Sequence, residues 1–178
     1  MKRPILAIAT LALVAGCATT PENRYYTLSA EPGAASAHDR RVTVAKVRLP
    51  GMMDRSQLVV RTGPQTVDIR EFDRWAEPLD QLVPRILAQD LASRTSRPNL
   101  ALPERHLFVA IDEFSADDAG AVLLVGRWWT LEPGEDAVQR QERPFALSRQ
   151  TEAGAKDGAH IAATMSILLG MLADDIGR

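Results

Sequence analysis

The sequence predicts an α/β (α+β) fold, a single domain in which two main helices pack on a largely antiparallel sheet. Two longer segments carry apolar residues at helical spacing, and shorter segments before and between them alternate or are rich in β-branched residues, as strands are. About 160 of the 178 residues lie beyond an N-terminal leader, a usual size for one domain with one core. Helices that cover one face of a sheet bury the apolar side of both elements, so we expect this layered arrangement.

Four strands are expected in the first half of the domain, because β-branched and aromatic residues favour a pleated surface. Pro50-Gly51 ends the second strand, and the turn Gly63-Pro64 joins the last two as a hairpin. The four strands are Arg24 to Ser29, Val42 to Leu49, Gln57 to Thr62 and Thr66 to Arg70. Residues 30–39 are rich in Ala, Ser, Pro and Gly, and we expect a mobile loop there.

The first helix is expected to begin near Pro78, since proline fits the opening turn of a helix, where its missing N–H costs nothing. Its apolar positions recur on one face at Leu79, Leu82, Val83, Ile86, Leu87 and Leu91. Pro84 conflicts with this pattern, because a proline inside a helix removes a hydrogen bond and clashes with the preceding turn. We therefore expect either a kink at Pro84 or a helix that properly begins at Val83.

Three strands and a second helix are expected in the second half. Leu107 to Ile111 alternates as a strand. Ala121 to Leu131 has apolar residues on both faces and should be central in the sheet, whereas Val138 to Ser148 carries Pro144 and should be an edge strand. The last helix is amphipathic, with apolar positions at Ile161, Met165, Leu168, Leu169, Leu172 and Ile176.

The single cysteine of the chain, Cys17, ends a pattern typical of secreted proteins. Lys2 and Arg3 form a cationic start, and the apolar run Ile5 to Ala15 that follows is too short to span a bilayer. The segment Leu13 to Cys17 resembles the lipobox of bacterial lipoproteins, in which the cysteine thiolate takes a diacylglyceryl group. The alternative is an ordinary cleaved signal with an unmodified cysteine.

Acylation of Cys17 would divide the chain into a lipoprotein signal peptide (1–16), a lipidated tether (17–23) and a folded domain (24–178). No free thiol would remain for a disulfide, a thiolate metal site or a cysteine nucleophile. The acyl chains would hold the domain on a membrane, because two or more of them anchor stably. Loss of Lys2 and Arg3 changes the formal net charge from −2 to −4, a balance that does not suit a nucleic-acid partner.

The sequence contains no pattern that predicts catalysis, a metal or a cofactor. Its three histidines have no partner at metal-ligand spacing. The acidic cluster between Asp112 and Asp118 lacks the pattern of a calcium loop, and Asp117 to Gly120 is ordinary hairpin-turn chemistry. No nucleophile is paired with a base, so we expect a protein that binds a partner and is not an enzyme.

Neighbouring tryptophans stand on the predicted central strand. The side chains of Trp128 and Trp129 must point to opposite faces of the sheet. One ring can join the core, and the other must lie under a helix, in a groove or against a partner, since Trp and Arg are enriched at interface hot spots. The residues slightly favour the interpretation that helices cover both rings.

The central part of the chain resembles a known family. Leu49-Pro50 is followed by Asp54-Arg55, by the strand Gln57 to Arg61, and by Arg74 to Leu79 (Arg-Trp-Ala-Glu-Pro-Leu) at a helix start. This block is similar to that of the PqiC-like auxiliary lipoproteins of ABC-type transport systems. Tyr25-Tyr26-Thr-Leu, close after the cysteine, also resembles the start of the family's domain.

The resemblance implies a role without a reaction. Lipoproteins of this family lie in the periplasm, anchored in the outer membrane, and serve MCE-type (mammalian cell entry) systems that move phospholipids or related hydrophobic molecules between the two membranes. It implies that the chain docks the periplasmic MCE tunnel protein, works with an inner-membrane permease and ATPase, and forms a homo-oligomeric ring. Ala18, in place of Asp, implies sorting to the outer membrane by the lipoprotein rule.

Five residues are candidates for the partner interface: Asp54, Arg55, Trp75, Trp128 and Trp129. The alternative for the first three is local structure, because turn formation, helix capping and a hydrophobic staple by Trp75 would account for them. Two other functions stay open. One is a stand-alone outer-membrane lipoprotein that binds a lipid or envelope component in its own pocket, and the other is an envelope hydrolase, which would need a cleft that gathers titratable groups.

We predict that Cys17 is acylated in the cell. Metabolic labelling with a clickable palmitate analogue should tag the wild-type chain and place it with membranes, because the thioether-linked acyl chains supply its membrane affinity. The Cys17→Ser variant should carry no label and leave the membrane fraction. An unlabelled wild type, together with a Cys17→Ser variant that still sediments with vesicles, would contradict the prediction.

Overall fold

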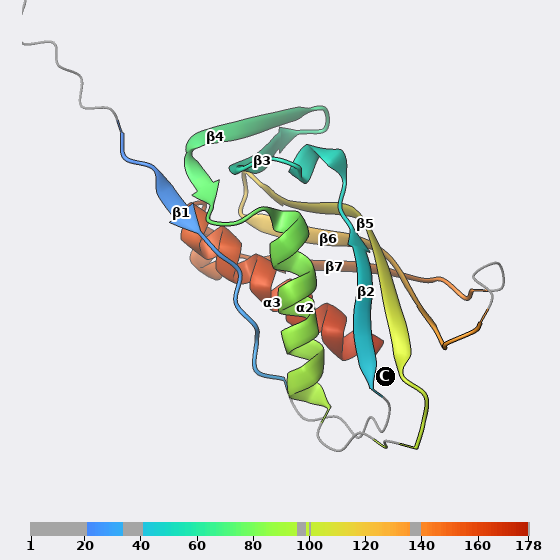
Figure 1. The fold of residues 1–178 in the computed structure, drawn as a ribbon. Coiled ribbons are helices and arrows are strands. Elements are labelled where there is room, and N and C mark those ends of the chain that lie inside the picture. Colours follow the sequence, from blue (N-terminus) through green and yellow to red (C-terminus); the bar gives the residue numbers. More distant parts are fainter. Residues whose placement is uncertain (1–20, 34–40, 96–98, 100, 136–139, 178) are drawn as a thin grey trace, which may run out of the picture.

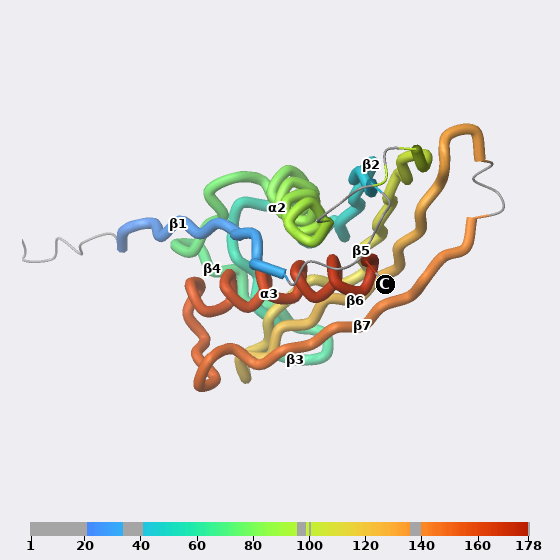
Figure 2. Tube along the Cα trace, turned by 90° about the horizontal axis from the view of Figure 1, so that it is seen from below, coloured from blue at the N-terminus to red at the C-terminus, as the bar shows by residue number. Residues whose placement is uncertain are grey.

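The computed structural model describes residues 21–33, 41–95, 99, 101–135 and 140–177. Seven strands form one sheet, and both long helices lie on the same side of it (Figures 1 and 2). In chain order the elements are β1 (Arg24–Tyr26), β2 (Val42–Arg48), the 3-10 turn η1 (Gly51–Met53), β3 (Gln57–Gly63), β4 (Thr66–Trp75), α2 (Leu79–Arg94), β5 (Arg105–Asp117), β6 (Ala121–Leu131), β7 (Arg143–Gln150), η3 (Glu152–Gly154) and α3 (Gly158–Ile176).

The sheet is mixed, with strand order β1-β4-β3-β5-β6-β7 and β2 paired to β5. The pairs β3/β4, β5/β6 and β6/β7 are antiparallel, as hairpin-connected strands must be. The pairs β1/β4, β2/β5 and β3/β5 are parallel. Strand β6 occupies one edge of β5, and β2 and β3 share the other edge. On that edge, β2 pairs with Arg105 to Ala110, and β3 pairs with Ala116 and Asp117. The chain between them, which contains η1, therefore leaves the sheet.

The predicted α/β class, with one sheet and two main helices, is confirmed. β6 has the predicted bounds and lies between β5 and β7, as its two-sided apolar pattern indicates. The bounds of four strands were wrong. β5 runs from Arg105 to Asp117, well beyond the predicted Leu107 to Ile111, because β6 pairs with it from His106 to Ala116. β1 is shorter than predicted because Thr27 to Ser29 turn away along the helices, and β4 continues to Trp75 because β1 pairs with its last three residues. β7 runs from Arg143 to Gln150 instead of from Val138 to Ser148, and residues 138 and 139 of the predicted strand lie outside the described residues.

Helix α2 begins at Leu79 with Pro78 as its N-cap, so the alternative start at Val83 was wrong. Pro84 lies inside the helix, where it removes one hydrogen bond, the one that Asp80 would have accepted. Packing outweighs this loss, since each predicted apolar position is buried: Leu79, Leu82, Val83, Ile86, Leu87 and Leu91. Tertiary contacts commonly override such a local conflict.

Helix α3 crosses the same face of the sheet beside α2 (Figure 2). Asp157 caps its start by accepting hydrogen bonds from the backbone N–H groups of Ala159 and His160, and the His160 bond holds the pKa of Asp157 below its usual range. By length and composition α3 could cross a membrane, but its apolar face is buried within the domain. All six predicted apolar positions are core residues: Ile161, Met165, Leu168, Leu169, Leu172 and Ile176.

We predict that Leu172→Ala lowers the free energy of unfolding by about 2–5 kcal/mol, because Leu172 is fully buried and its removal leaves a cavity under α3. The neighbouring Met171 is 37% exposed, so Met171→Ala should cost less than about 1 kcal/mol. Urea unfolding of both variants measures the difference. Equal losses would contradict the assignment of α3 as the central core helix.

Candidate functional site

A groove of about 560 Å³ opens between η1 and the start of α2. Three of the five predicted interface residues, Asp54, Arg55 and Trp75, line this groove together. Most of its other lining residues belong to the same sequence block: Val47, Arg48, Leu49, Pro50, Gly51, Met53, Ser56, Ala76, Glu77, Pro78, Leu79 and Asp80. Two segments about 20 residues apart thus converge on one cavity.

Backbone hydrogen bonds shape both walls of the groove. The N–H of Met53 donates to the Pro50 carbonyl at 2.9 Å, and the N–H of Asp54 donates to the Gly51 carbonyl at 3.2 Å, which closes the 3-10 turn. The N–H of Trp75 donates to the Ser56 carbonyl at 2.7 Å and joins the end of β4 to this turn. The groove therefore has a fixed shape that depends on pairing between the two segments.

The floor of the groove is apolar and its rim is charged. Trp75 is 5% exposed and lies with the buried side chains of Met53 and Leu79. At the rim, the Arg55 Nε donates to the Met52 carbonyl at 3.1 Å, while Asp54 is exposed. Such an arrangement can bind a segment that has both an apolar and a charged part. Within the described residues, His, Cys, Asp and Glu form no group of three or more able to hold a metal.

The Glu77 carboxylate at the same rim forms an ion pair with Arg85 of α2, with both oxygens 3.2 Å from the Arg85 Nη2. An acidic side chain is favourable ahead of a helix start because the helix dipole is positive there. Glu77 thus supports the start of α2 and also forms one side of the groove.

Trp128 lies far from the groove in the topology, in a second cavity of about 920 Å³ formed by the ends of α2 and α3 with β6 and β7. Its ring is buried, its Nε1 donates to Asp175 Oδ2 at 3.1 Å, and the Arg143 guanidinium lies 5.1 Å from the ring centre. Helix α3 therefore covers Trp128 from one side, as predicted for a core ring.

The interpretation that helices cover both tryptophans was wrong for Trp129. This ring points to the other face of the sheet, where it stacks on Phe108 with ring centres 5.6 Å apart, and the Arg140 guanidinium lies 5.0 Å from the Trp129 ring centre. Alternation along β6 dictates this outcome, because both long helices occupy the opposite face. Trp128 and Trp129 do not join the groove residues.

Cys17 lies outside the described residues, but the segment that leads from it is held firmly. We call residues 24–33 the strap. Its first part is β1, and it then passes along both helices (Figure 1). Leu28 is buried in the core, and the N–H of Ser29 donates to the Ser166 Oγ of α3 at 3.1 Å. At β1, Arg24 forms a 2.8 Å ion pair with Asp73.

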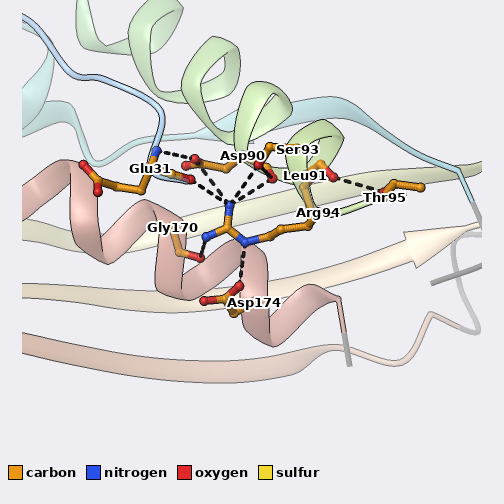
Figure 3. Close-up of polar contacts among 8 residues, drawn as sticks. All are labelled: Glu31, Asp90, Leu91, Ser93, Arg94, Thr95, Gly170 and Asp174. Carbon is orange, nitrogen blue, oxygen red and sulfur yellow. Dashed lines mark hydrogen bonds and ion pairs between the residues drawn. The ribbon is translucent and has the colours of Figure 1, made fainter. Parts of the chain in front are cut away.

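The end of the strap is fastened by Arg94, which is 4% exposed in its side chain (Figure 3). Its Nη1 donates to the carbonyls of Glu31, at 3.2 Å, and of Asp90, at 3.0 Å. Its Nη2 donates to the Gly170 carbonyl at 3.0 Å, and its Nε pairs with Asp174 Oδ1 at 2.5 Å. One guanidinium therefore joins the strap, α2 and α3.

Asp90 completes this cluster from the interior. Its Oδ1 accepts the Glu31 N–H at 2.7 Å and lies 3.5 Å from the Arg94 Nη1, but its buried Oδ2 has no hydrogen-bond partner among the described residues. Burial raises the pKa of Asp90 to about 6, despite the opposing effects of the Glu31 N–H and Arg94. Sequence analysis missed this cluster, although Asp90 and Arg94 fall on the apolar face of α2, a position where charges are rarely placed without partners.

The fold defines a class of protein, a mixed-sheet α/β domain with two helices on one face, whose N-terminal strap is built into the core. Comparison with known proteins gives the family. The model of the family described as ABC-type transport auxiliary lipoprotein component matches residues 26–177. The chain belongs to this family.

Individual relatives agree with this assignment. The chain is 31% identical over 166 residues, covering 86% of both proteins, to the intermembrane transport lipoprotein PqiC of Escherichia coli K12, and equally to that of Shigella flexneri. Two crystal structures share the fold. One is of an uncharacterized protein, with a TM-score of 0.70 and 24% identity over 89% of this chain and 98% of that one. The other is of a Xanthomonas campestris protein, with a TM-score of 0.67 and 18% identity over 86% and 91% of the two chains.

We predict a pH-dependent stability that depends on Asp90. Because its pKa is raised from 3.8 to about 6, the folded chain binds a proton more readily than the unfolded chain, and Asp90 stabilises the fold more as pH falls from about 7.5 to 4. Relative to Asp90→Asn, the free energy of unfolding of the wild type should therefore rise by up to about 3 kcal/mol over this range. Urea unfolding at a series of pH values measures it.

Asp174→Asn is the matched control, because it changes the other carboxylate beside Arg94 and leaves Asp90 in place. The free energy of unfolding of Asp174→Asn should still rise as pH falls, because Asp90 is unchanged in that variant. If wild type and Asp90→Asn give parallel curves, Asp90 does not titrate in this range. The charged groups that face Asp90 are Arg94 on its own helix, Glu31 of the strap and Asp174 of α3.

Proposed function

We propose that this lipoprotein docks the periplasmic end of an MCE-type tunnel protein through the groove between η1 and α2, as a component of lipid transport between two membranes. The observation that carries the proposal is the groove itself, because Asp54, Arg55 and Trp75 come from separate segments and line one cavity. An apolar floor ringed by charges suits a protein segment, with specificity from the rim and affinity from the buried aromatic ring.

The proposed location is the periplasmic face of the outer membrane, with acyl chains, palmitate among them, on Cys17. Ala18 after the cysteine supports sorting to the outer membrane. The name of the E. coli relative, an intermembrane transport lipoprotein, supports work between two membranes. Six residues separate Cys17 from Arg24, so an extended tether of seven Cα–Cα steps reaches about 25 Å at most and keeps the domain beside the lipid.

The proposed complex also contains an inner-membrane permease and ATPase, which the family description, an auxiliary component of ABC-type transport, supports. We further propose that several copies form a ring around the end of the tunnel. A ring of several copies could surround the end of a tunnel, whereas a single copy would contact only one side of it. Two strand edges, β7 and the part of β4 that β1 leaves unpaired, could contact a neighbouring copy. We propose that the chain binds and positions the tunnel protein and does not catalyse a reaction.

A second candidate function is a stand-alone outer-membrane lipoprotein that binds a lipid or envelope component. The cavity of about 920 Å³ beside Trp128 favours it, since Arg105 and Arg143 line a largely polar cavity that also exposes apolar side chains such as Leu91 and Ile176, a mixture that suits a charged headgroup with an apolar part. Native mass spectrometry of the protein extracted from membranes discriminates the two. A monomer that carries a lipid favours this second function.

We predict that Gly51→Trp abolishes capture of the MCE-domain partner. Gly51 lines the groove and a Cβ there would contact nothing within 4 Å, so the backbone accepts a side chain at this position and a bulky indole should obstruct the groove. Pull-down of the tagged, lipidated protein from membranes should recover the partner with the wild type and at least about tenfold less with Gly51→Trp, the loss of one good anchor contact.

Gly51→Ala is the control, because it changes the same backbone position and leaves the groove open. Its capture should match the wild type. Recovery of no MCE-domain protein with the wild type would overturn the proposed role, and equal capture by Gly51→Trp would show that the partner binds elsewhere.

A further inference from the structure

Two large apolar side chains are exposed at the same end of the domain. Tyr25 of β1 is 63% exposed, and Met52 of η1 is 37% exposed. Tyr26, the neighbour of Tyr25, points inward and packs against Gly158 at the start of α3, so strand alternation forces Tyr25 outward. The core therefore explains Tyr26 and leaves Tyr25 without an internal role.

A continuous set of contacts joins these side chains to two arginines. Tyr25 and Gln57 are the register partners of Arg74 on its two sides, so Arg74 lies next to Tyr25 in the sheet. The Arg74 Nη1 reaches the Ser56 Oγ at 3.5 Å, and Arg55, adjacent to Ser56, binds the Met52 carbonyl. We call Tyr25, Met52, Arg55 and Arg74 the β1-end patch.

Neither arginine of the patch is neutralised within the part of the chain that the structure describes. Arg55 donates to the Met52 carbonyl, and Arg74 donates to the Glu71 carbonyl and the Ser56 hydroxyl, while no carboxylate lies within ion-pair distance of either. Asp54 precedes Arg55 but does not pair with it. By contrast, Arg24, Arg61, Arg70, Arg85 and Arg127 all have carboxylate partners.

The short chain segment between Cys17 and β1 places this patch close to a membrane. Arg24 is fixed in β1 beside Tyr25, and only six residues lie between it and Cys17. If Cys17 is inserted in a bilayer, an extended tether holds the β1 end within about 25 Å of the acyl chains, and a relaxed tether brings it closer. The exposed ring, the thioether of Met52 and the guanidinium groups of Arg55 and Arg74 thus lie at the end of the domain that the short tether holds near the headgroups.

We infer that the β1-end patch lies on the phospholipid headgroup layer, with Tyr25 inserted at the interface and Arg55 and Arg74 bound to lipid phosphates. This inference rests on the proposed acylation of Cys17. Tyr is a residue that settles at membrane interfaces because its ring is apolar and its hydroxyl remains hydrated. Arginine binds phosphate through two parallel hydrogen bonds, which a carbonyl-bound side chain can still supply by turning outward. The contact fixes the orientation of the domain and presents the neighbouring groove beside the membrane.

The test places a fluorophore on the patch. Cys17 is the only natural cysteine and carries the lipid in this proposal, so Tyr25→Cys or Met52→Cys supplies the single free thiol. The full lipidated chain is labelled with NBD and reconstituted in vesicles of phosphatidylethanolamine and phosphatidylglycerol that contain lipid with a nitroxide headgroup. Met171→Cys is the matched control, since Met171 is as exposed as Met52 and lies about 20 Å along α3 from Gly158.

We expect headgroup nitroxides to quench NBD at positions 25 and 52 at least about threefold more than at 171, as surface contact requires. The double variant Arg55→Gln/Arg74→Gln should reduce quenching at position 25, whereas Arg149→Gln, an exposed arginine on β7, should not. Equal quenching at 25 and 171 in protein that floats with vesicles would overturn the inference and leave the anchor proposal intact. Protein that does not float would overturn the anchor proposal, and the inference with it.

Discussion

The buried guanidinium of Arg94 is the interaction on which the rest of the structure depends. It ties the strap to both helices through two carbonyls outside its own helix, at Glu31 and Gly170, and through an ion pair with Asp174. A Cβ at Gly33 would overlap this guanidinium, so the chain can pass over it only as glycine. Removal of one partner from such a buried set is costly, because the remaining charges stay desolvated without compensation. Asp90 already shows the effect of such desolvation, because burial raises the pKa of its carboxyl group.

This fastening matters for function because the strap connects the core to the proposed anchor. Residues that follow a lipidated cysteine are often a loose linker, but here β1 completes the sheet and Leu28 fills the core. Tyr26, the register partner of Trp75, joins the strap to the floor of the groove. Pairing of β1 with the end of β4 therefore ties the strap to one wall of the groove, so that the segment leading to the proposed anchor has a fixed place relative to the groove.

Periodicity predicted the elements well because burial follows local pattern closely. Each apolar position predicted for α2 and α3 is in the core, and β6 has its predicted bounds. The errors occurred where pairing with distant residues decides. β4 extends to Trp75 because β1, about 50 residues earlier, pairs with it, and α2 tolerates Pro84 because its buried face outweighs one lost hydrogen bond. The candidate site was predicted in part: Asp54, Arg55 and Trp75 converge, whereas Trp128 and Trp129 lie elsewhere.

The sequence by itself determined the order of the elements, their buried faces, the lipobox-like leader and the family resemblance, because spacing, turn chemistry and short motifs are local properties. Only the tertiary structure decided that the segments 47–56 and 75–80 enclose one groove, and that Trp129 faces away from the helices. It also decided that Asp90 and Arg94 serve the strap. These outcomes depend on which distant strands pair and on which face of the sheet the helices cover, and no single segment contains that information.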